Sequence, residues 1–112
     1  MEFLERFDNF KESEIRSLNI ISPQEIELTL TAQDKARSYD WVSVTFSFSG
    51  VTDARLLDEK KIGFIDFDDG ITLLNENNTI GFGVGKYHNI LGIKNASLYI
   101  IADRFKYNEG SF

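Results

Sequence analysis

The chain has 112 residues, with 12 Lys and Arg against 18 Asp and Glu, and its formal net charge is −6. This length fits a single domain, residues 1–112, with one hydrophobic core. The acidic balance argues against nucleic acid and anionic membranes as partners, because both are bound through clustered Lys and Arg. A basic protein partner is allowed, and the net field would speed its approach.

Cysteine is absent, which excludes a disulfide framework, a thiol nucleophile and a thiolate metal site. The segment after Met1 shows neither the basic nor the apolar region of a secretory signal. No apolar run approaches the ~20 residues that a membrane span needs. We therefore expect a cytoplasmic protein without a membrane-spanning segment.

The first predicted element is an amphipathic helix over Glu2–Lys11. Its apolar residues recur at helical spacing: Phe3, Leu4, Phe7 and Phe10. A helix of about three turns is marginal alone, so it should dock its Phe stripe on the rest of the domain.

Two segments then alternate strictly between apolar and polar residues, which indicates strands of a half-solvated antiparallel sheet. Glu25–Gln33 carries Leu28 and Leu30 on one side and threonines on the other. Trp41–Ser49 carries Val and Phe on one side and hydroxyl residues on the other, and Gly50 is expected to end it.

Turn signals recur about every 8–12 residues along the chain, and no long helix separates the strands. The remaining predicted strands are Glu14–Ile21, Val51–Leu57, Ile62–Phe67, Ile71–Leu74, Thr79–Tyr87, Ile90–Ile93 and Ser97–Tyr107. The expected fold class is mainly β, an antiparallel meander-like β-sandwich or open barrel with one short N-terminal helix.

Glycines at alternate positions, Gly81, Gly83 and Gly85, form a bare strip on one side of a predicted strand. Their spacing fits neither a phosphate loop nor a dinucleotide fingerprint, because the required Gly and Ser/Thr positions are missing. A strip without side chains lets a ring, a backbone or a ligand lie close to the sheet. The sequence therefore leaves two interpretations open, internal packing and a groove for a ligand or partner.

No residue pattern predicts a metal site or a cofactor. The Asp66–Gly70 segment fails the register of a calcium loop, and His88, the single histidine, has no cysteine or second histidine to share a zinc ion. As a general base, His88 would need an orienting carboxylate nearby. We expect Asp58 and Glu59, which run into lysines, to lie on a solvated surface.

Aromatic residues are abundant, with ten Phe, four Tyr and one Trp. If the Val and Phe residues of Trp41–Ser49 face the core, Trp41 lies on the hydroxyl side or at its rim, either exposed as an interaction anchor or buried under another element. On the last strand, Tyr99, Phe105 and Tyr107 share one parity, opposite to Leu98, Ile100 and Ala102.

The order of the first three segments resembles that of small bacterial all-β proteins of the polymorphic-toxin immunity type. The resemblance lies in Phe7–Ser17, then Ile26–Leu30, then Val44–Val51, and covers roughly the first half of the chain. Where that family has His-Asp, this chain has Lys11 and Glu12. The resemblance implies a stoichiometric protein binder, and it transfers no functional residue.

The sequence therefore favours a non-catalytic protein-binding module that recognises a basic protein or a second copy of itself. The acidic residues predicted to steer such a partner are Asp34, Asp40, Asp58 and Glu59, with Trp41 as the anchor. One alternative is a small-molecule-binding β-fold with the glycine strip as one wall. Another is a small enzyme that uses His88 with a carboxylate.

Overall fold

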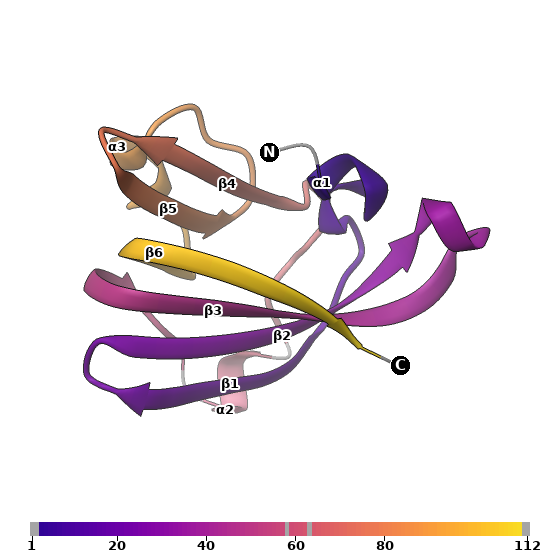
Figure 1. Cartoon of the computed structure of the whole chain (residues 1–112), viewed down its shortest axis with the longest axis horizontal. Helices are drawn as coiled ribbons and strands as arrows, with labels where there is room; N and C mark the ends of the chain where they lie inside the picture. The colour runs from indigo at the N-terminus through magenta and orange to yellow at the C-terminus, as the bar shows by residue number, and fades with distance from the viewer. Residues whose placement is uncertain (1–2, 58, 63, 111–112) are drawn as a thin grey trace.

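The computed structural model describes residues 3–57, 59–62 and 64–110 as six strands with short helical turns between them (Figure 1). The strands are β1 (Ile15–Ser22), β2 (Glu25–Asp34), β3 (Asp40–Arg55), β4 (Ile71–Glu76), β5 (Thr79–Val84) and β6 (Tyr99–Gly110). The helical turns are α1 (Phe3–Arg6), η1 (Asp8–Phe10), η2 (Lys35–Arg37), α2 (Glu59–Ile62) and α3 (Ile90–Ile93). None of these described helices has the length and apolar character that a membrane crossing requires.

All six strands belong to one open antiparallel sheet in the order β1-β2-β3-β6-β5-β4. The sheet consists of two three-stranded meanders, and the long β3–β6 pair joins them at the centre (Figure 1). The predicted fold class, mainly β and antiparallel with a short N-terminal helix, is confirmed. The described strands form one open sheet rather than the two packed sheets of a sandwich.

The inner face of this sheet carries the main core. Leu28, Leu30, Val44, Phe46 and Phe48 are buried there, as their alternation predicts. The ring of Phe46 lies at the centre of an aromatic cluster, with centroids 5.3 to 5.8 Å from its nearest partners, which are Phe10, Phe82 and Phe105. Burial of these large rings contributes favourably to folding.

The N-terminal segment covers the inner face, but with less helix than predicted. The α-helix stops at Arg6, and Asp8, Asn9 and Phe10 adopt positive φ angles of 55°, 58° and 59°. Asp and Asn tolerate this left-handed region better than other non-glycine residues. Phe7 and Phe10 are nevertheless buried, so the predicted docking of the Phe stripe is correct although the three-turn helix is wrong.

Gly50 was predicted to end the Trp41–Ser49 strand, but β3 continues through it to Arg55. Gly50 has a φ of +65°, and the pairing of β3 with β6 shifts register between Val51 and Asp53. A Cβ on Gly50 would lie 2.8 Å from Oδ2 of Asp103. Glycine here permits a close crossing at which the strand bends instead of stopping.

The same irregularity changes which residues of β6 face inward. Ile100 and Ala102 lie in the main core, and so does Phe105, although its parity is opposite. The predicted separation of Phe105 from these residues is therefore wrong, because the strand switches sides near Asp103. Tyr99 is buried on the outer face with Ile101.

Two predicted strands are helical or irregular instead. Ile62 of the predicted Ile62–Phe67 strand belongs to α2, and the described residues 64–67 of that range form no strand. Ile90–Ile93 forms α3, whose N-cap Asn89 accepts a hydrogen bond at Oδ1 from the Gly92 N–H at 2.7 Å. A four-residue apolar run fits a buried helical turn and a strand equally well, and the Asn cap favours the helix.

Candidate binding surface

The outer face of β2 and β3 is lined by small hydroxyl residues. We call this surface the serine–threonine face, and its members are Thr29, Ser43, Thr45, Ser47 and Ser49. They are half-buried, because the described helical segments pack elsewhere, α1 and η1 on the inner face and α3 against β4 and β5. The Oγ1 atoms of Thr29 and Thr45 are hydrogen-bonded to each other at 2.9 Å.

Charged residues flank this face in matched rows. The strand registers place Glu27 beside Ser47 and Ser47 beside Lys106. In the adjacent row, Glu25 lies beside Ser49, and Ser49 beside Arg104. An acidic ridge on β2 and a basic ridge on β6 thus run parallel, separated by two strand spacings, or about 10 Å.

The two ridges do not neutralise each other. Among the residues that the structure describes, no ion pair includes Glu25, Glu27, Arg104 or Lys106. Arg104 donates from Nε to Oγ of Ser49 at 3.3 Å, which turns its guanidinium toward the floor between the ridges. Both ridges therefore keep charge available for a ligand.

Between the ridges lies an open groove of about 650 Å³, which we call the serine groove. Ser47, Ser49 and the four ridge residues line it, together with Asp103 and with four residues of the main core: Ile26, Phe48, Ile80 and Phe105. Ile21 also lines it and is 57% exposed, so the groove has an apolar rim at the β1 side. The groove thus combines small serines, two ridges of opposite charge and the exposed Ile21. Such a groove suits a partner surface that is mostly polar and has one apolar side chain.

Trp41 lies on the same side of the sheet, farther along β3, beside Gln33 of β2. Its side chain is 42% exposed, while the next residue, Val42, points into the core. The sequence left open whether Trp41 is exposed or buried. In the structure its ring is partly exposed, at one end of the serine–threonine face. Tyr39, in the adjoining loop, is also exposed.

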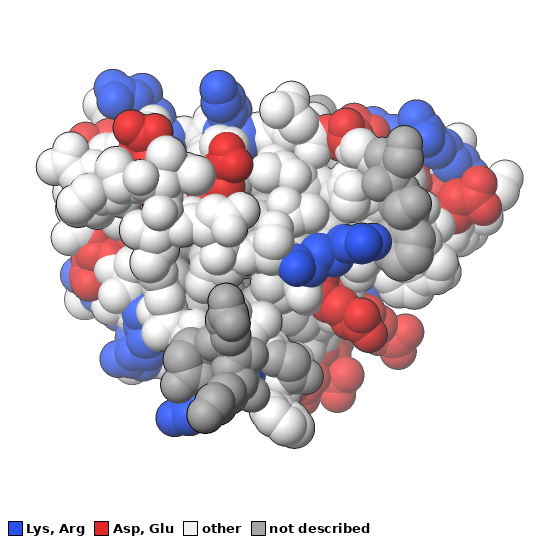
Figure 2. Space-filling model, turned by 90° about the horizontal axis from the view of Figure 1, so that it is seen from below, with Lys and Arg blue, Asp and Glu red and all other residues white. Residues whose placement is uncertain are grey.

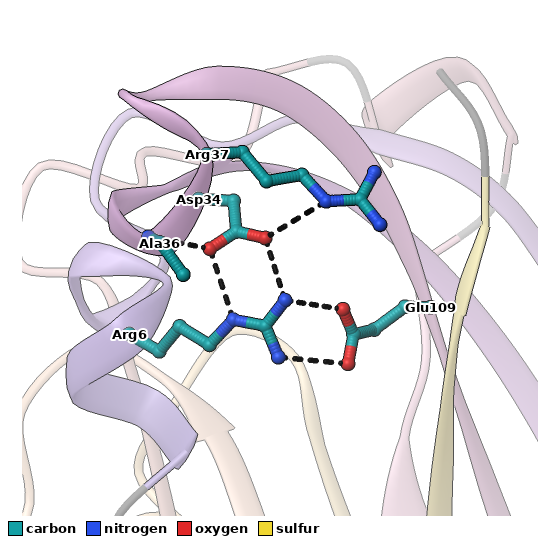
Figure 3. A network of polar contacts seen from close by, with 5 residues as sticks. All are labelled: Arg6, Asp34, Ala36, Arg37 and Glu109. Carbon is teal, nitrogen blue, oxygen red and sulfur yellow. Dashed lines mark hydrogen bonds and ion pairs between the residues drawn. The ribbon is translucent and has the colours of Figure 1, made fainter.

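Asp34 was predicted to steer a partner, but the structure places it in the interior. Its side chain has 0% exposure and accepts two hydrogen bonds from Arg6, Nε to Oδ1 at 2.9 Å and Nη2 to Oδ2 at 2.7 Å (Figure 3). The Ala36 N–H also donates to Oδ1 at 2.9 Å, and Arg37 lies 3.7 Å away. The prediction for Asp34 is therefore wrong, because the carboxylate is consumed by internal contacts.

Arg6 connects three elements through this network, which we call the arginine clasp. Besides Asp34 of β2, it donates two hydrogen bonds to Glu109 of β6, at 3.0 and 2.7 Å (Figure 3). The hydrogen bonds from Arg6 hold the pKa of Asp34 below its usual range, although burial opposes this shift. The clasp fixes α1 against the sheet and is a structural feature.

The other predicted acidic residues differ in position. Asp40 is exposed at the start of β3, next to Trp41, so it remains available to a partner. Asp58 and the side chain of Glu59 lie outside the described residues.

The glycine strip is covered by the chain itself. A Cβ on Gly81 would lie 2.9 Å from Cδ1 of Ile93, and one on Gly83 would lie 3.2 Å from Cγ2 of Ile93. Gly85, with a φ of +117°, lies under the ring of Tyr87. The strip therefore serves internal packing, and the groove interpretation is wrong, because Ile93 of α3 and the ring of Tyr87 fill the space that a ligand would need.

His88 is exposed on the loop that precedes α3, and no described carboxylate forms a hydrogen bond or ion pair with it. The described residues also contain no group of three or more His, Asp or Glu side chains arranged to hold a metal ion. Asp66, Asp68 and Asp69 are exposed, and repulsion from Asp66 raises the pKa of Asp68. Oδ1 of Asp66 accepts a hydrogen bond from the Asp68 N–H at 2.7 Å, as in an Asx turn.

Sequence reasoning did not identify the two ridges, although part of their signal is readable. Glu25 and Glu27 share the parity of Thr29, so their position on the outer face follows from alternation. The partner ridge could not be placed, because it depends on the pairing of β6 with β3 and on the side switch near Asp103.

Comparison with known proteins adds no relative: no family model, no curated protein and no solved structure matches this chain.

Proposed function

We propose that the protein is a non-catalytic module that binds another protein on its serine–threonine face. The observation that carries this proposal is the serine groove, whose acidic and basic ridges have no ion-pair partners among the described residues. A fold that left these charges unpaired at about 10 Å separation presents a ready pattern for complementary charges. The small serines between them let a partner approach the sheet closely.

The recognition mechanism follows from the positions of the side chains. Cationic groups of the partner would meet Glu25 and Glu27, and its carboxylates would meet Arg104 and Lys106. Trp41 and Ile21, at the two ends of the surface, would provide the apolar contacts that dominate most interfaces. Asp40, beside Trp41, adds a further acidic contact.

The partner that fits best is a predominantly basic protein. The net charge of −6 would accelerate its approach at low ionic strength, while the two ridges would fix its orientation. This function agrees with what the resemblance to toxin-immunity proteins implies, in which case the partner would be a toxin that the module neutralises.

The test begins with affinity capture from the native host at low and high salt, followed by purification of the captured protein and titration against variants. Removal of the acidic ridge in E25Q/E27Q should weaken binding by at least about tenfold at low salt, with a smaller effect at high salt. Trp41→Ala should weaken binding at both salt concentrations. Failure to capture a protein, or binding insensitive to both changes, would overturn the proposal.

The matched control removes the same number of carboxylates outside the face. D66N/D69N lowers the negative charge equally, but at an exposed turn between α2 and β4. It should reduce the association rate slightly and leave the dissociation rate unchanged.

A further inference from the structure

The strand β1 is one edge of the sheet, with β2 as its single neighbour. Half of its backbone N–H and C=O groups therefore point away from the sheet, in the arrangement that accepts another strand. Natural edge strands usually prevent such pairing with proline, with several charges or with covering segments.

β1 has few of these protections. Its eight residues contain no proline and no acidic residue, and Arg16 is its single charge. Ile20 is 64% exposed, and Ile21, beside the serine groove, is exposed almost as much. Seen from below, where β1 is the nearest strand, uncharged residues make up much of the visible surface, and a Lys or Arg side chain lies just right of its centre (Figure 2).

Bulges lie at the two ends of β1 and leave a regular segment between them. The register with β2 is continuous from Ser17 to Ile20 and shifts on either side. This regular segment is long enough for a short antiparallel ladder with another strand.

We propose that β1 pairs antiparallel with β1 of a second copy of this chain, about a two-fold axis at Asn19. The two sheets would then form one continuous sheet with their inner faces on the same side. This homodimer uses the edge of the sheet and goes beyond the proposed binding function, which uses its outer face.

The segment is complementary to itself in this register. Leu18 and Ile20 both lie on the inner side, opposite Leu28 and Ile26 of β2. Pairing about Asn19 places Leu18 of each copy opposite Ile20 of the other, so the exposed aliphatic side chains become buried in two equivalent contacts. Arg16 falls opposite Ser22, which keeps the two cations apart.

The charge distribution favours a second copy despite the net charge of −6. Strands β2, β3, β4 and β6 all contain acidic residues, whereas β1 contains none. Because β1 carries no carboxylate, pairing β1 with β1 places no two carboxylates directly opposite each other. Two copies joined at this edge would present two serine–threonine faces on one side.

The absence of cysteine allows a direct test by disulfide trapping. Asn19→Cys places one thiol at the proposed axis, where directly opposed strand residues lie about 4.5–5.5 Å apart between Cα atoms, within disulfide range. The matched control, Asn75→Cys, changes an exposed Asn on β4, the opposite edge. Under mild oxidation, Asn19→Cys should become mostly covalent dimer, while Asn75→Cys should remain monomer.

The oligomeric state of the unmodified chain completes the test. Light scattering coupled to size-exclusion chromatography should give twice the 12.8 kDa chain mass at high concentration. Ile20→Lys should weaken the dimer at least tenfold, and Leu91→Lys, which changes a 78% exposed residue on α3, should not. A wild-type mass of one chain at every concentration, or equal cross-linking of the two cysteine variants, would overturn the proposal.

Discussion

The two halves of the outer sheet face differ in what covers them. On the β4–β5 half, Gly81 and Gly83 leave room for Ile93 of α3, and an outer apolar cluster forms around it. On the β2–β3 half, serine and threonine occupy the equivalent alternate positions, and no described helix lies over them. Side-chain size at alternate positions thus separates a structural surface from one that is available for binding.

The two halves also place different energetic demands on the chain. The apolar side chains of the covered half must be removed from water, so α3 contributes to folding. The hydroxyls of the exposed half can bond to each other, as Thr29 and Thr45 do, or to water. Leaving this half uncovered therefore costs the fold little, so substitutions in the two halves should differ in their effect on stability.

The largest expected effect comes from the inner face, which both halves share. Phe46→Ala removes the ring at the centre of the aromatic cluster and should lower the free energy of unfolding by about 3–5 kcal/mol. Ser47→Ala, one residue along on the outer face, should change it by less than about 0.5 kcal/mol. Urea denaturation of both variants measures the difference, and comparable losses would contradict the assignment of the two faces.

The next effect separates the covered half from the exposed half. Gly83→Val directs a side chain into the space occupied by Ile93 and Ala96, and it should cost about 1–3 kcal/mol. Ser47→Val places the same side chain on the exposed half and should stay within about 0.5 kcal/mol of wild type. If the two valines were equally tolerated, the covering role of α3 would be wrong.

The arginine clasp predicts a pH-dependent difference at one end of the sheet. Because Arg6 lowers the pKa of Asp34 in the folded state, the stabilisation is complete at neutral pH. It is lost as the pH falls from the usual Asp range to the lower folded value. Asp34→Asn should lower Tm by roughly 5 °C at pH 7, and the gap to wild type should narrow at acidic pH. A gap that is constant with pH would argue against a charged clasp.

The smallest effect concerns a single hydrogen bond beneath α3. Tyr99 donates from its hydroxyl to Oδ2 of Asp53 at 3.1 Å, so Tyr99→Phe should cost about 1 kcal/mol. Tyr107→Phe is the control, because this ring stacks on Phe3 and lies partly exposed. The thermal unfolding of Tyr107→Phe should match that of wild type. An equal loss of stability in both variants would contradict a stabilising role for the Tyr99–Asp53 hydrogen bond.

Much of the fold could be predicted from alternation alone. The period of two in β2 and β3 identified the inner core residues and the hydroxyl side correctly, because each strand has one buried face. Alternation failed where the backbone departs from regular geometry. Gly50 bends β3 instead of ending it, and the side switch near Asp103 brings Phe105 into the core.

The candidate site was less predictable, because it depends on contacts between distant parts of the chain. Trp41 was placed on the correct side, but its exposure depends on what packs nearby. The role of Asp34 depends on Arg6, 28 residues before it, and the second clasp partner, Glu109, is 103 residues from Arg6. A surface acid and a clasp acid look the same in the sequence.

Blocking each half of the outer face in turn shows whether the exposed half is the binding surface. Isothermal titration of the captured protein would compare Ser47→Arg, which places a bulky side chain in the serine groove, with Leu91→Arg on α3. We expect Ser47→Arg to reduce affinity at least tenfold and Leu91→Arg to bind like wild type. Equal affinity of Ser47→Arg and wild type would contradict this expectation.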